Sequence, residues 1–161
     1  MEQTEVKVLL QQCFEDEARY QFPAFSHADA WELGKILVET CREYEGPLAV
    51  EIEIDRVVVF RYFPDGTGEY HEQWLRRKRN TVNTLERSSL RFFCELTENG
   101  EDMVRDWLLD PMEYAYCGGA FPIKQSGGSV IGVAAVSGLP HLRDNAALME
   151  GIRRYLSKKK T

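Results

Sequence analysis

The chain has 161 residues, of which 43% are hydrophobic and 29% are charged, and its formal net charge is -6 at pH 7. This length and composition predict one globular domain spanning residues 1–161, long enough to bury a real core. The negative charge argues against a protein that binds nucleic acid or an anionic membrane. No apolar run is long enough to span a bilayer, and the first residues lack the order of a signal peptide, so we expect a cytoplasmic protein.

The spacing of cysteine and histidine excludes the usual zinc sites. The four cysteines stand at 13, 41, 94 and 117 without a Cys-x-x-Cys pair, and the histidines at 27, 71 and 141 have no partner one helical turn away. We therefore expect reduced thiols, three of them small core residues, and no metal site. The sequence also lacks a P-loop, a dinucleotide fingerprint and a Ser-His-Asp order.

Two amphipathic helices are predicted at the start of the chain. The first covers residues 4–19, where apolar side chains recur at helical spacing. The second follows Ser26, which forms a capping-box pattern with Asp29 three residues later, and it runs toward Tyr44. The Gly46-Pro47 pair ends this second helix.

The hydrophobic period then changes from helical to alternating. Residues 47–54 (PLAVEIEI) place apolar side chains on one face of a strand and two glutamates on the other. Asp55-Arg56 links this strand to residues 57–63 (VVVFRYF), which predicts an antiparallel hairpin. Residues 64–68 (PDGTG) form the loop that follows.

Helical patterns return in the second half of the chain. Three are predicted, over residues 69–87, 89–98 and 101–109, and the last of these ends before Asp110-Pro111. A final helix begins near Pro140, a favourable first position. We expect it to face the sheet with the stripe Asn145, Met149, Ile152 and Leu156.

The glycine-rich stretch at residues 114–138 predicts a second hairpin, with Gly127-Gly128 at its turn. Its second strand is apolar on both faces and should be central, whereas Pro122 suits its first strand to an edge. Gly118-Gly119 should allow a ligand or another backbone to come close. The element order therefore predicts an α+β fold. We expect an α-β-α sandwich of the profilin-like or PAS-like kind, whose mainly antiparallel sheet of two hairpins is flanked by N- and C-terminal helices.

Three sequence blocks carry a resemblance to a known family. They are residues 74–82 (WLRRKRNTV) with Ser88-Ser89, residues 117–123 (CGGAFPI), and residues 132–140 (GVAAVSGLP) with Asp144. Together they resemble the GlcG/HbpS-like family of heme-degrading-domain and heme-binding proteins. The match is closest to its small stand-alone branch, an uncharacterised protein family (UPF).

The resemblance implies a profilin-like sandwich, assembly into dimers or rings of dimers, and a cytoplasmic setting. It also implies that heme, or a related tetrapyrrole, is a possible ligand. Two positions depart from the pattern of this branch. The residue before Gly118-Gly119, commonly histidine, is Cys117 here, and the residue after Asp144, also commonly histidine, is Asn145. If either imidazole serves relatives, this chain has lost it.

Each candidate site residue has a structural interpretation beside the functional one. Cys117 is either a thiolate ligand or reactive thiol, or a small buried residue, and we favour the buried residue. Ser137-Gly138, before the last helix, is either an anion site or an ordinary turn, with equal weight. Asp144 either orients a substrate or caps the last helix, and capping is the commoner role. His141 is a possible general base or axial ligand, but a lone histidine usually has no such role.

The basic run at residues 76–79 surrounds most of a helix, so we interpret it as a solvated face or a subunit contact rather than a nucleic-acid patch. Lys78 differs because it shares a stripe with Trp74 and Val82, and it either reaches a buried carboxylate or a ligand, or extends its stem to solvent.

The leading functional hypothesis is an oligomeric, non-enzymatic binding module with heme or another small ligand near the glycine-rich hairpin. The alternatives are a heme- or tetrapyrrole-degrading enzyme and an assembly or chaperone-adaptor protein that acts through its oligomer surface. No catalytic residue is predicted. The predicted ligand-binding residues are Trp74, Arg77, Lys78, Cys117, Gly118, Gly119, Phe121, Ser137, Gly138 and Asp144.

Overall fold

The computed structural model describes residues 1–160 of the chain. The helices and strands in this range are α1 (Gln3–Arg19), α2 (His27–Cys41), β1 (Ala49–Ile54), β2 (Val57–Tyr62), α3 (Glu69–Leu85), α4 (Ser89–Asn99), β3 (Ala120–Lys124), β4 (Val130–Ser137) and α5 (His141–Lys159). None of the helices in this range is both long and apolar enough to cross a membrane.

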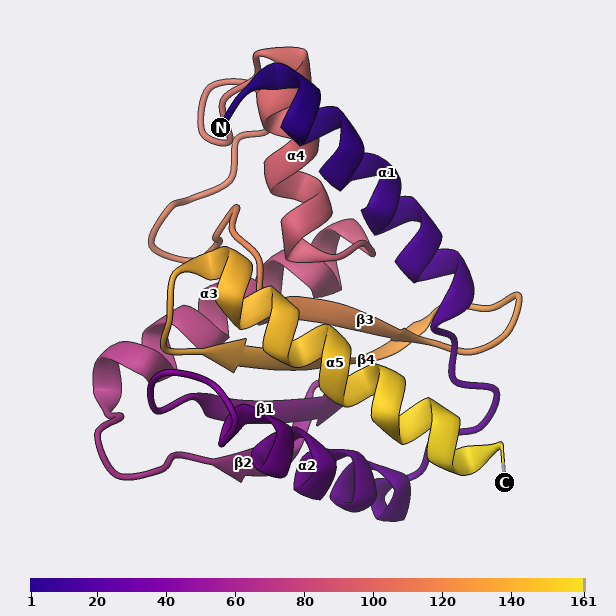
Figure 1. The fold of residues 1–161 in the computed structure, drawn as a ribbon. Helices are drawn as coiled ribbons and strands as arrows, with labels where there is room; N and C mark the ends of the chain where they lie inside the picture. The colour runs from indigo at the N-terminus through magenta and orange to yellow at the C-terminus, as the bar shows by residue number, and fades with distance from the viewer. Residues whose placement is uncertain (161) are drawn as a thin grey trace.

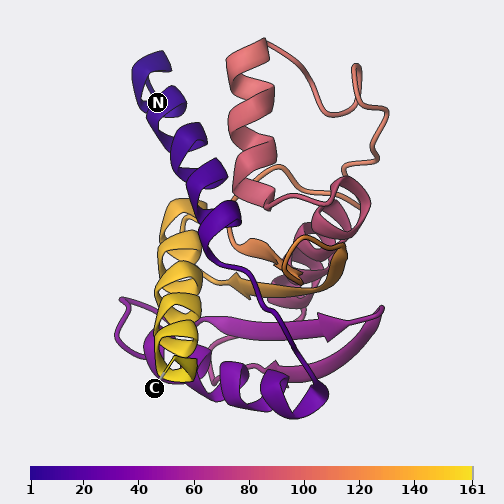
Figure 2. The ribbon, with the colours of Figure 1, turned by 90° about the vertical axis from the view of Figure 1, so that its right-hand side faces the viewer.

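The four strands form one sheet in the order β2-β1-β4-β3, and each neighbouring pair is antiparallel. Helices α2 and α5 cover one face of the sheet and α3 covers the other, as two perpendicular views show (Figure 1, Figure 2). This arrangement confirms the predicted α-β-α sandwich built from two hairpins. Strand β3, which carries Pro122, lies at an edge as expected.

Strand β4 is central and covered on both faces, as its two apolar faces predicted. Ala134 and Val136 join the large core under α2 and α5, whereas Val133 and Ala135 pack toward α3. Small side chains on both faces let the helices approach the sheet closely.

The acidic face of β1 is buried beneath α3 instead of facing solvent. Glu51 is 1% exposed and accepts hydrogen bonds from the guanidinium groups of Arg61 and Arg79. Glu53 accepts from Asn83 at 2.6 Å and pairs with Arg79 at 3.0 Å. Buried charges need such partners, and here they tie α3 to the sheet at a defined position.

The capping box predicted for the second helix is present. The amide of Asp29 donates to the Ser26 hydroxyl at 3.2 Å, and the amide of Ser26 donates to the Asp29 carboxylate at 2.9 Å. These two bonds satisfy amide groups that the first helical turn leaves without intrahelical partners. The helix ends at Cys41, slightly before the predicted end near Tyr44.

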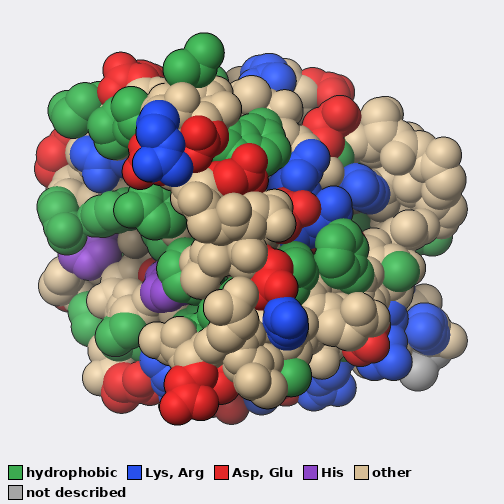
Figure 3. Space-filling model, turned by 90° about the horizontal axis from the view of Figure 1, so that it is seen from above, with side chains coloured by type: hydrophobic (Ala, Val, Ile, Leu, Met, Phe, Trp, Pro, Cys, Tyr) green, Lys and Arg blue, Asp and Glu red, His purple; other side chains and the backbone are tan. Residues whose placement is uncertain are grey.

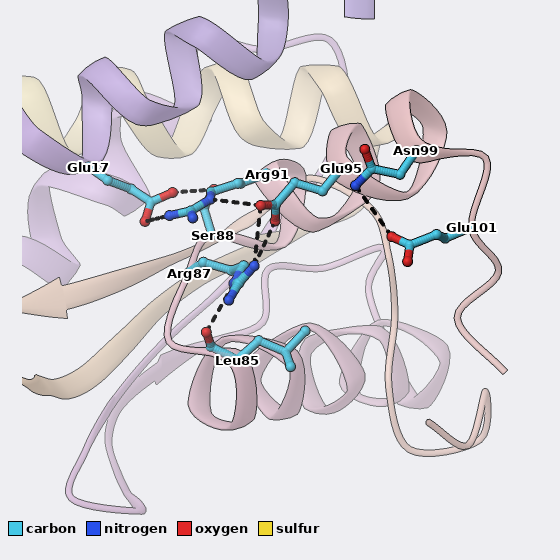
Figure 4. A network of polar contacts seen from close by, with 8 residues as sticks. All are labelled: Glu17, Leu85, Arg87, Ser88, Arg91, Glu95, Asn99 and Glu101. Atoms are coloured by element: carbon cyan, nitrogen blue, oxygen red, sulfur yellow. Dashed lines mark hydrogen bonds and ion pairs between the residues drawn. The ribbon is translucent and has the colours of Figure 1, made fainter. Parts of the chain in front are cut away.

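Helices α1 and α4 pack on each other beyond the β3 edge (Figure 1). A polar network joins them at one end of their contact, where Glu17 of α1 accepts from Ser88 at 3.4 Å and from Arg91 at 3.2 Å (Figure 4). Arg91 also pairs with Glu95. Their apolar contact includes Cys13 and Cys94, and these two cysteines and Cys41 are buried, which confirms three thiols as small core residues.

The prediction of a helix over residues 101–109 is wrong, because this segment forms turns. The Asp102 carboxylate accepts hydrogen bonds from the amides of Val104 and Arg105, at 3.0 and 2.7 Å. An aspartate that binds nearby amides in this way competes with helical hydrogen bonds. The backbone of Leu108 then takes a left-handed conformation with φ of 56°, which a helix does not allow.

The predicted face of α5 is also only partly right. Ile152 is buried, but Asn145, Met149 and Leu156 lie half-buried at its border. The residues buried on this helix are Asp144, Ala147, Leu148, Gly151, Ile152 and Tyr155. Gly151 faces Leu37 of α2 with no room for a side chain. The two helices therefore meet at a glycine, which a count of large apolar residues overlooks.

We predict that Gly119→Val destabilises the protein by roughly 1–3 kcal/mol or more. Gly119 has φ of 120°, and a Cβ there would lie 2.6 Å from the carbonyl oxygen of Val136 and 2.5 Å from Lys78 Nζ. Chemical denaturation measures the loss. Gly128→Ala is the matched control, because its nearest neighbour lies at 3.4 Å and surface changes of this kind shift stability by about 0.5 kcal/mol or less. Equal stability of the two variants would show that Gly119 is incidental.

Candidate ligand-binding cavity

A cavity of about 310 Å³ opens where the first half of α3 meets the start of α5. We call it the α3–α5 cavity. Seen from above, one face of the molecule shows two imidazole groups beside a group of hydrophobic side chains (Figure 3). The residues that line the cavity are Tyr70, His71, Trp74, Lys78, Cys117, Ser137, Gly138, Leu139, His141 and Asp144.

A buried ion pair stands at the base of the cavity. Lys78 of α3 is 2% exposed, and its ammonium lies 2.9 Å from the Asp144 carboxylate of α5 and 3.0 Å from the carbonyl oxygen of Val136. The second carboxylate oxygen of Asp144 accepts from the amide of Leu139 at 2.8 Å. Burial raises the pKa of Asp144, while the Lys78 charge and these hydrogen bonds favour the carboxylate form.

His141 is held in place by the backbone before β3. The amide of Gly118 donates to Nδ1 of His141 at 2.8 Å, and the imidazole packs edge-on against Phe93 with ring centroids 4.8 Å apart. Burial, and then the nearby Lys78 charge, lower the pKa of His141, so the imidazole is neutral at pH 7.

His71 is fixed in the same manner at the start of α3. The amide of Gly68, the N-cap residue, donates to Nδ1 of His71 at 3.1 Å. Its ring contacts Tyr70 edge-on, with centroids 6.3 Å apart. Both imidazoles at the cavity therefore use Nδ1 as an acceptor for a backbone amide.

An aromatic wall and a second cation lie on the same helix. Tyr70 and Trp74 meet edge-on with ring centroids 6.2 Å apart, and the Arg77 guanidinium lies 4.9 Å from the centroid of the Trp74 ring. The Nε of Arg77 is buried and has no hydrogen-bond partner within residues 1–160. This side of the cavity combines a flat apolar surface with positive charge.

Cys117 lines the cavity and is only partly buried, unlike the other three cysteines. Burial nevertheless raises the pKa of its thiol, and this effect outweighs the opposing influence of Lys78. A thiol is a weak nucleophile and ligand while it stays protonated.

The structure brings together most of the residues proposed from the sequence. Trp74, Lys78, Cys117, Ser137, Gly138 and Asp144 line the cavity, Gly118 binds His141 and Gly119 lies against Lys78. Lys78 reaches a buried carboxylate, one of the two outcomes foreseen for it. Two predicted residues do not line the cavity. Phe121 lies in the core under α2 and α5, and Arg77 lies against the Trp74 ring.

The possible anion site at Ser137-Gly138 is occupied by the chain itself. The Asp144 carboxylate accepts the amide of Leu139, directly before α5. The carboxylate thereby ties the turn to the first part of α5, and its second oxygen pairs with Lys78. The geometric interpretation of this turn describes these contacts best. The predicted capping by Asp144 is wrong for the amides of α5 itself, because the Leu139 amide precedes the N-cap residue Pro140, and α5 has no side-chain cap.

The sequence interpretation missed His71, Tyr70 and Leu139 as cavity residues. Positions 71, 74 and 78 fall at spacings of three and four, so they share one face of α3. That spacing from Trp74 and Lys78 is the sequence signal that could have identified His71 as a cavity residue. Leu139 gave no comparable signal, because it follows a glycine in a turn whose path depends on the fold.

The family model described as haem degrading protein HbpS-like matches residues 25–153. The chain belongs to the HbpS-like family. A UPF0303 protein of Streptomyces avermitilis is 34% identical over 142 residues, which cover 88% of this chain and 87% of that protein. The resemblance that the sequence blocks indicated is thereby confirmed.

Two solved structures share this fold over most of their length. The crystal structure of Ybr137w protein matches with a TM-score of 0.89 at 23% identity, covering 98% of this chain and 93% of that one. The crystal structure of a PduOC–heme complex matches with a TM-score of 0.68 at 16% identity, covering 81% and 94%. At these identities the likeness establishes the fold, and ligands must be argued from the residues present.

We predict that breaking the Lys78–Asp144 pair on one side costs about 3–5 kcal/mol, because an unpaired charge stays buried. Lys78→Met and Asp144→Asn should each lose this stability in urea denaturation. The double variant should lose clearly less than the sum of the two, because neither charge remains. Lys35→Met is the control: its exposed pair with Glu32 at 3.1 Å contributes about 0–1 kcal/mol. Strictly additive losses would contradict a coupled pair.

Proposed function

We propose that the protein is a binding module, not an enzyme, and that it takes a small ligand into the α3–α5 cavity. The observation that carries this proposal is the state of the groups lining the cavity. Both imidazoles are held by backbone amides, and the Cys117 thiol is kept protonated by burial. The cavity therefore offers fixed hydrogen bonds and a flat wall, but neither a free basic nitrogen nor a thiolate for covalent chemistry.

The lining residues do not fit the iron of heme. A histidine that ligates a metal offers one ring nitrogen as a lone pair and donates the N–H of the other to an acceptor. In His71 and His141 the arrangement is reversed, because Nδ1 accepts a backbone N–H and the ring hydrogen lies on Nε2. Cys117 offers a protonated sulfur. Within residues 1–160 no cluster of three potential metal ligands occurs either.

This donor set also weighs against a heme-degrading enzyme, the first alternative. Heme degradation requires a held iron and a source of electrons, and the cavity residues supply no suitable iron ligand. The family description and the heme-complex neighbour concern other proteins, and ligands can differ between members of one fold.

A screen of small molecules by protein-observed NMR tests the proposal. We expect some compounds of low molecular mass to shift the Trp74 indole and the Gly118 amide, which report on the cavity. The indole of Trp31, 57% exposed on α2, is the internal control and should not move with them. If no compound shifts Trp74 and Gly118 selectively, the cavity is not a binding site.

A second test is a titration of the protein with hemin, followed by absorption spectroscopy. Binding should be weak, and His71→Ala and His27→Ala should bind hemin equally, because neither imidazole is offered to iron. Tight hemin binding that His71→Ala abolishes would contradict the donor argument.

We propose further that the module is a homo-oligomer, a dimer or a ring of dimers. The chain exposes neighbouring apolar side chains where α1 lies beside the start of α5, including Val8 at 66% and Leu142 at 38%. Apolar exposure of this kind often marks protein contacts. Size-exclusion chromatography with light scattering at micromolar concentration should give at least twice the 18.6 kDa chain mass. An 18.6 kDa species alone would end this proposal.

We place the protein in the cytoplasm. All four cysteines are free thiols, and three of them are buried in the core as reduced residues. Reduced thiols are maintained in the cytosol, whereas oxidising compartments favour disulfides.

A further inference from the structure

Both imidazoles at the α3–α5 cavity present a hydrogen-bond donor. A backbone amide can only donate, so Nδ1 of His71 and Nδ1 of His141 must each carry a lone pair. A neutral imidazole has one N–H, which must then lie on Nε2. Neither Nε2 has a hydrogen-bond partner among residues 1–160. Two donors of defined position are therefore left for a ligand.

The only carboxylate among the lining residues is already bound by the chain. One oxygen of Asp144 accepts from Lys78 and the other from the amide of Leu139. Lys78 gives two of its three N–H groups, to Asp144 and Val136. A ligand group that enters the cavity consequently meets donors in excess of acceptors.

Charge around the cavity points the same way. Among the lining residues Lys78 and Asp144 balance each other, and the Arg77 guanidinium adds a positive charge behind the Trp74 ring of the wall, although the whole chain carries -6. The Nε of Arg77 is buried without a partner, so this guanidinium is not neutralised through that atom. A donor-rich pocket with an additional cation beside it favours an anionic group.

The shape of the cavity limits the rest of the ligand. Its 310 Å³ is at the low end of the range for ligand pockets, and Tyr70 and Trp74 provide a flat apolar wall. A small planar body suits this wall, and a macrocycle does not suit this volume.

We propose, on the basis of the binding function above, that the α3–α5 cavity binds a small aromatic carboxylate. The carboxylate oxygens accept the Nε2–H groups of His71 and His141, and the aromatic ring lies against Trp74. The first helical turn of α5 is not the anion site, because the chain's own Asp144 already takes the amide of Leu139 beside it.

Neutral donors give this mode a distinctive pH dependence. The charges of Lys78 and Asp144 act on His141, Cys117 lines the same cavity, and the Tyr70 ring contacts His71. With an ordinary imidazole pKa of about 6.5, an imidazolium site would lose most of its charge, by more than about tenfold, between pH 6.5 and 8. A neutral His141 keeps its Nε2–H over that range, so its contribution to the affinity stays constant.

The experiment is a calorimetric titration of the full chain with benzoate, compared with benzyl alcohol of similar shape and with acetate, which lacks the ring. We expect benzoate to bind at least about tenfold more tightly than either, a difference of about 1.4 kcal/mol. His71→Phe should weaken benzoate binding by about tenfold, because it removes one hydrogen bond to a charged group. His27→Phe, at the start of α2 outside the cavity, should leave benzoate binding unchanged.

Several outcomes would overturn the inference. If benzoate fails to bind, or benzyl alcohol binds equally well, the carboxylate class is wrong, whereas the proposed binding function stands if other compounds still shift Trp74. A more than tenfold loss of benzoate affinity between pH 6.5 and 8 would show imidazolium donors. Nitrogen-15 NMR of labelled histidine gives a direct test that needs no variant to fold: both cavity imidazoles must show the hydrogen on Nε2, and a hydrogen on Nδ1 of either would refute the proposed donors.

Discussion

The contact on which this end of the molecule depends is the buried pair of Lys78 and Asp144. The two residues come from helices on opposite faces of the sheet, 66 positions apart, and they meet beside Gly119 at 2.9 Å. Only a residue without a side chain leaves room there for the ammonium, 2.5 Å from where a Cβ would stand. The glycine, the pair and the carbonyl of Val136 thus form one unit that joins α3, β4 and α5.

This unit determines which hydrogen-bonding groups the α3–α5 cavity offers to a ligand. Pairing with Lys78 and the Leu139 amide engages both oxygens of Asp144, which is 2% exposed, so this carboxylate is directed to the chain itself. The amides of Gly68 and Gly118 then set both histidines as Nε2–H donors. A buried ion pair contributes little net stability compared with a well-packed apolar pair. Its clearest consequence here is the donor-rich character of the site, together with the fixed positions of α3 and α5.

The alternating and helical patterns were enough to predict the sandwich, the central β4 and the edge β3, because these depend on local hydrophobic period. Prediction failed where a local feature overrides the hydrophobic period. Asp102 redirects the backbone of residues 101–109 through its own hydrogen bonds, and Gly151 buries a face of α5 that carries few large residues. The site was partly predictable, since Lys78 stood on an apolar stripe. The role of His71 was not, because its tautomer depends on an amide that only the folded loop brings to Nδ1.

The two departures from the family pattern meet at this same site. Cys117 lines the cavity, and a side chain at Gly118 would lie 3.1 Å from the Cβ of Asn145, so both positions at which the resemblance implied histidine adjoin one glycine pair. A protonated thiol at the first position and an amide at the second are both poorer ligands for iron than an imidazole. The imidazoles that remain at the cavity have their Nδ1 atoms bound to backbone amides. The donors that remain at the cavity therefore support the proposed ligand, which is recognised through its oxygens.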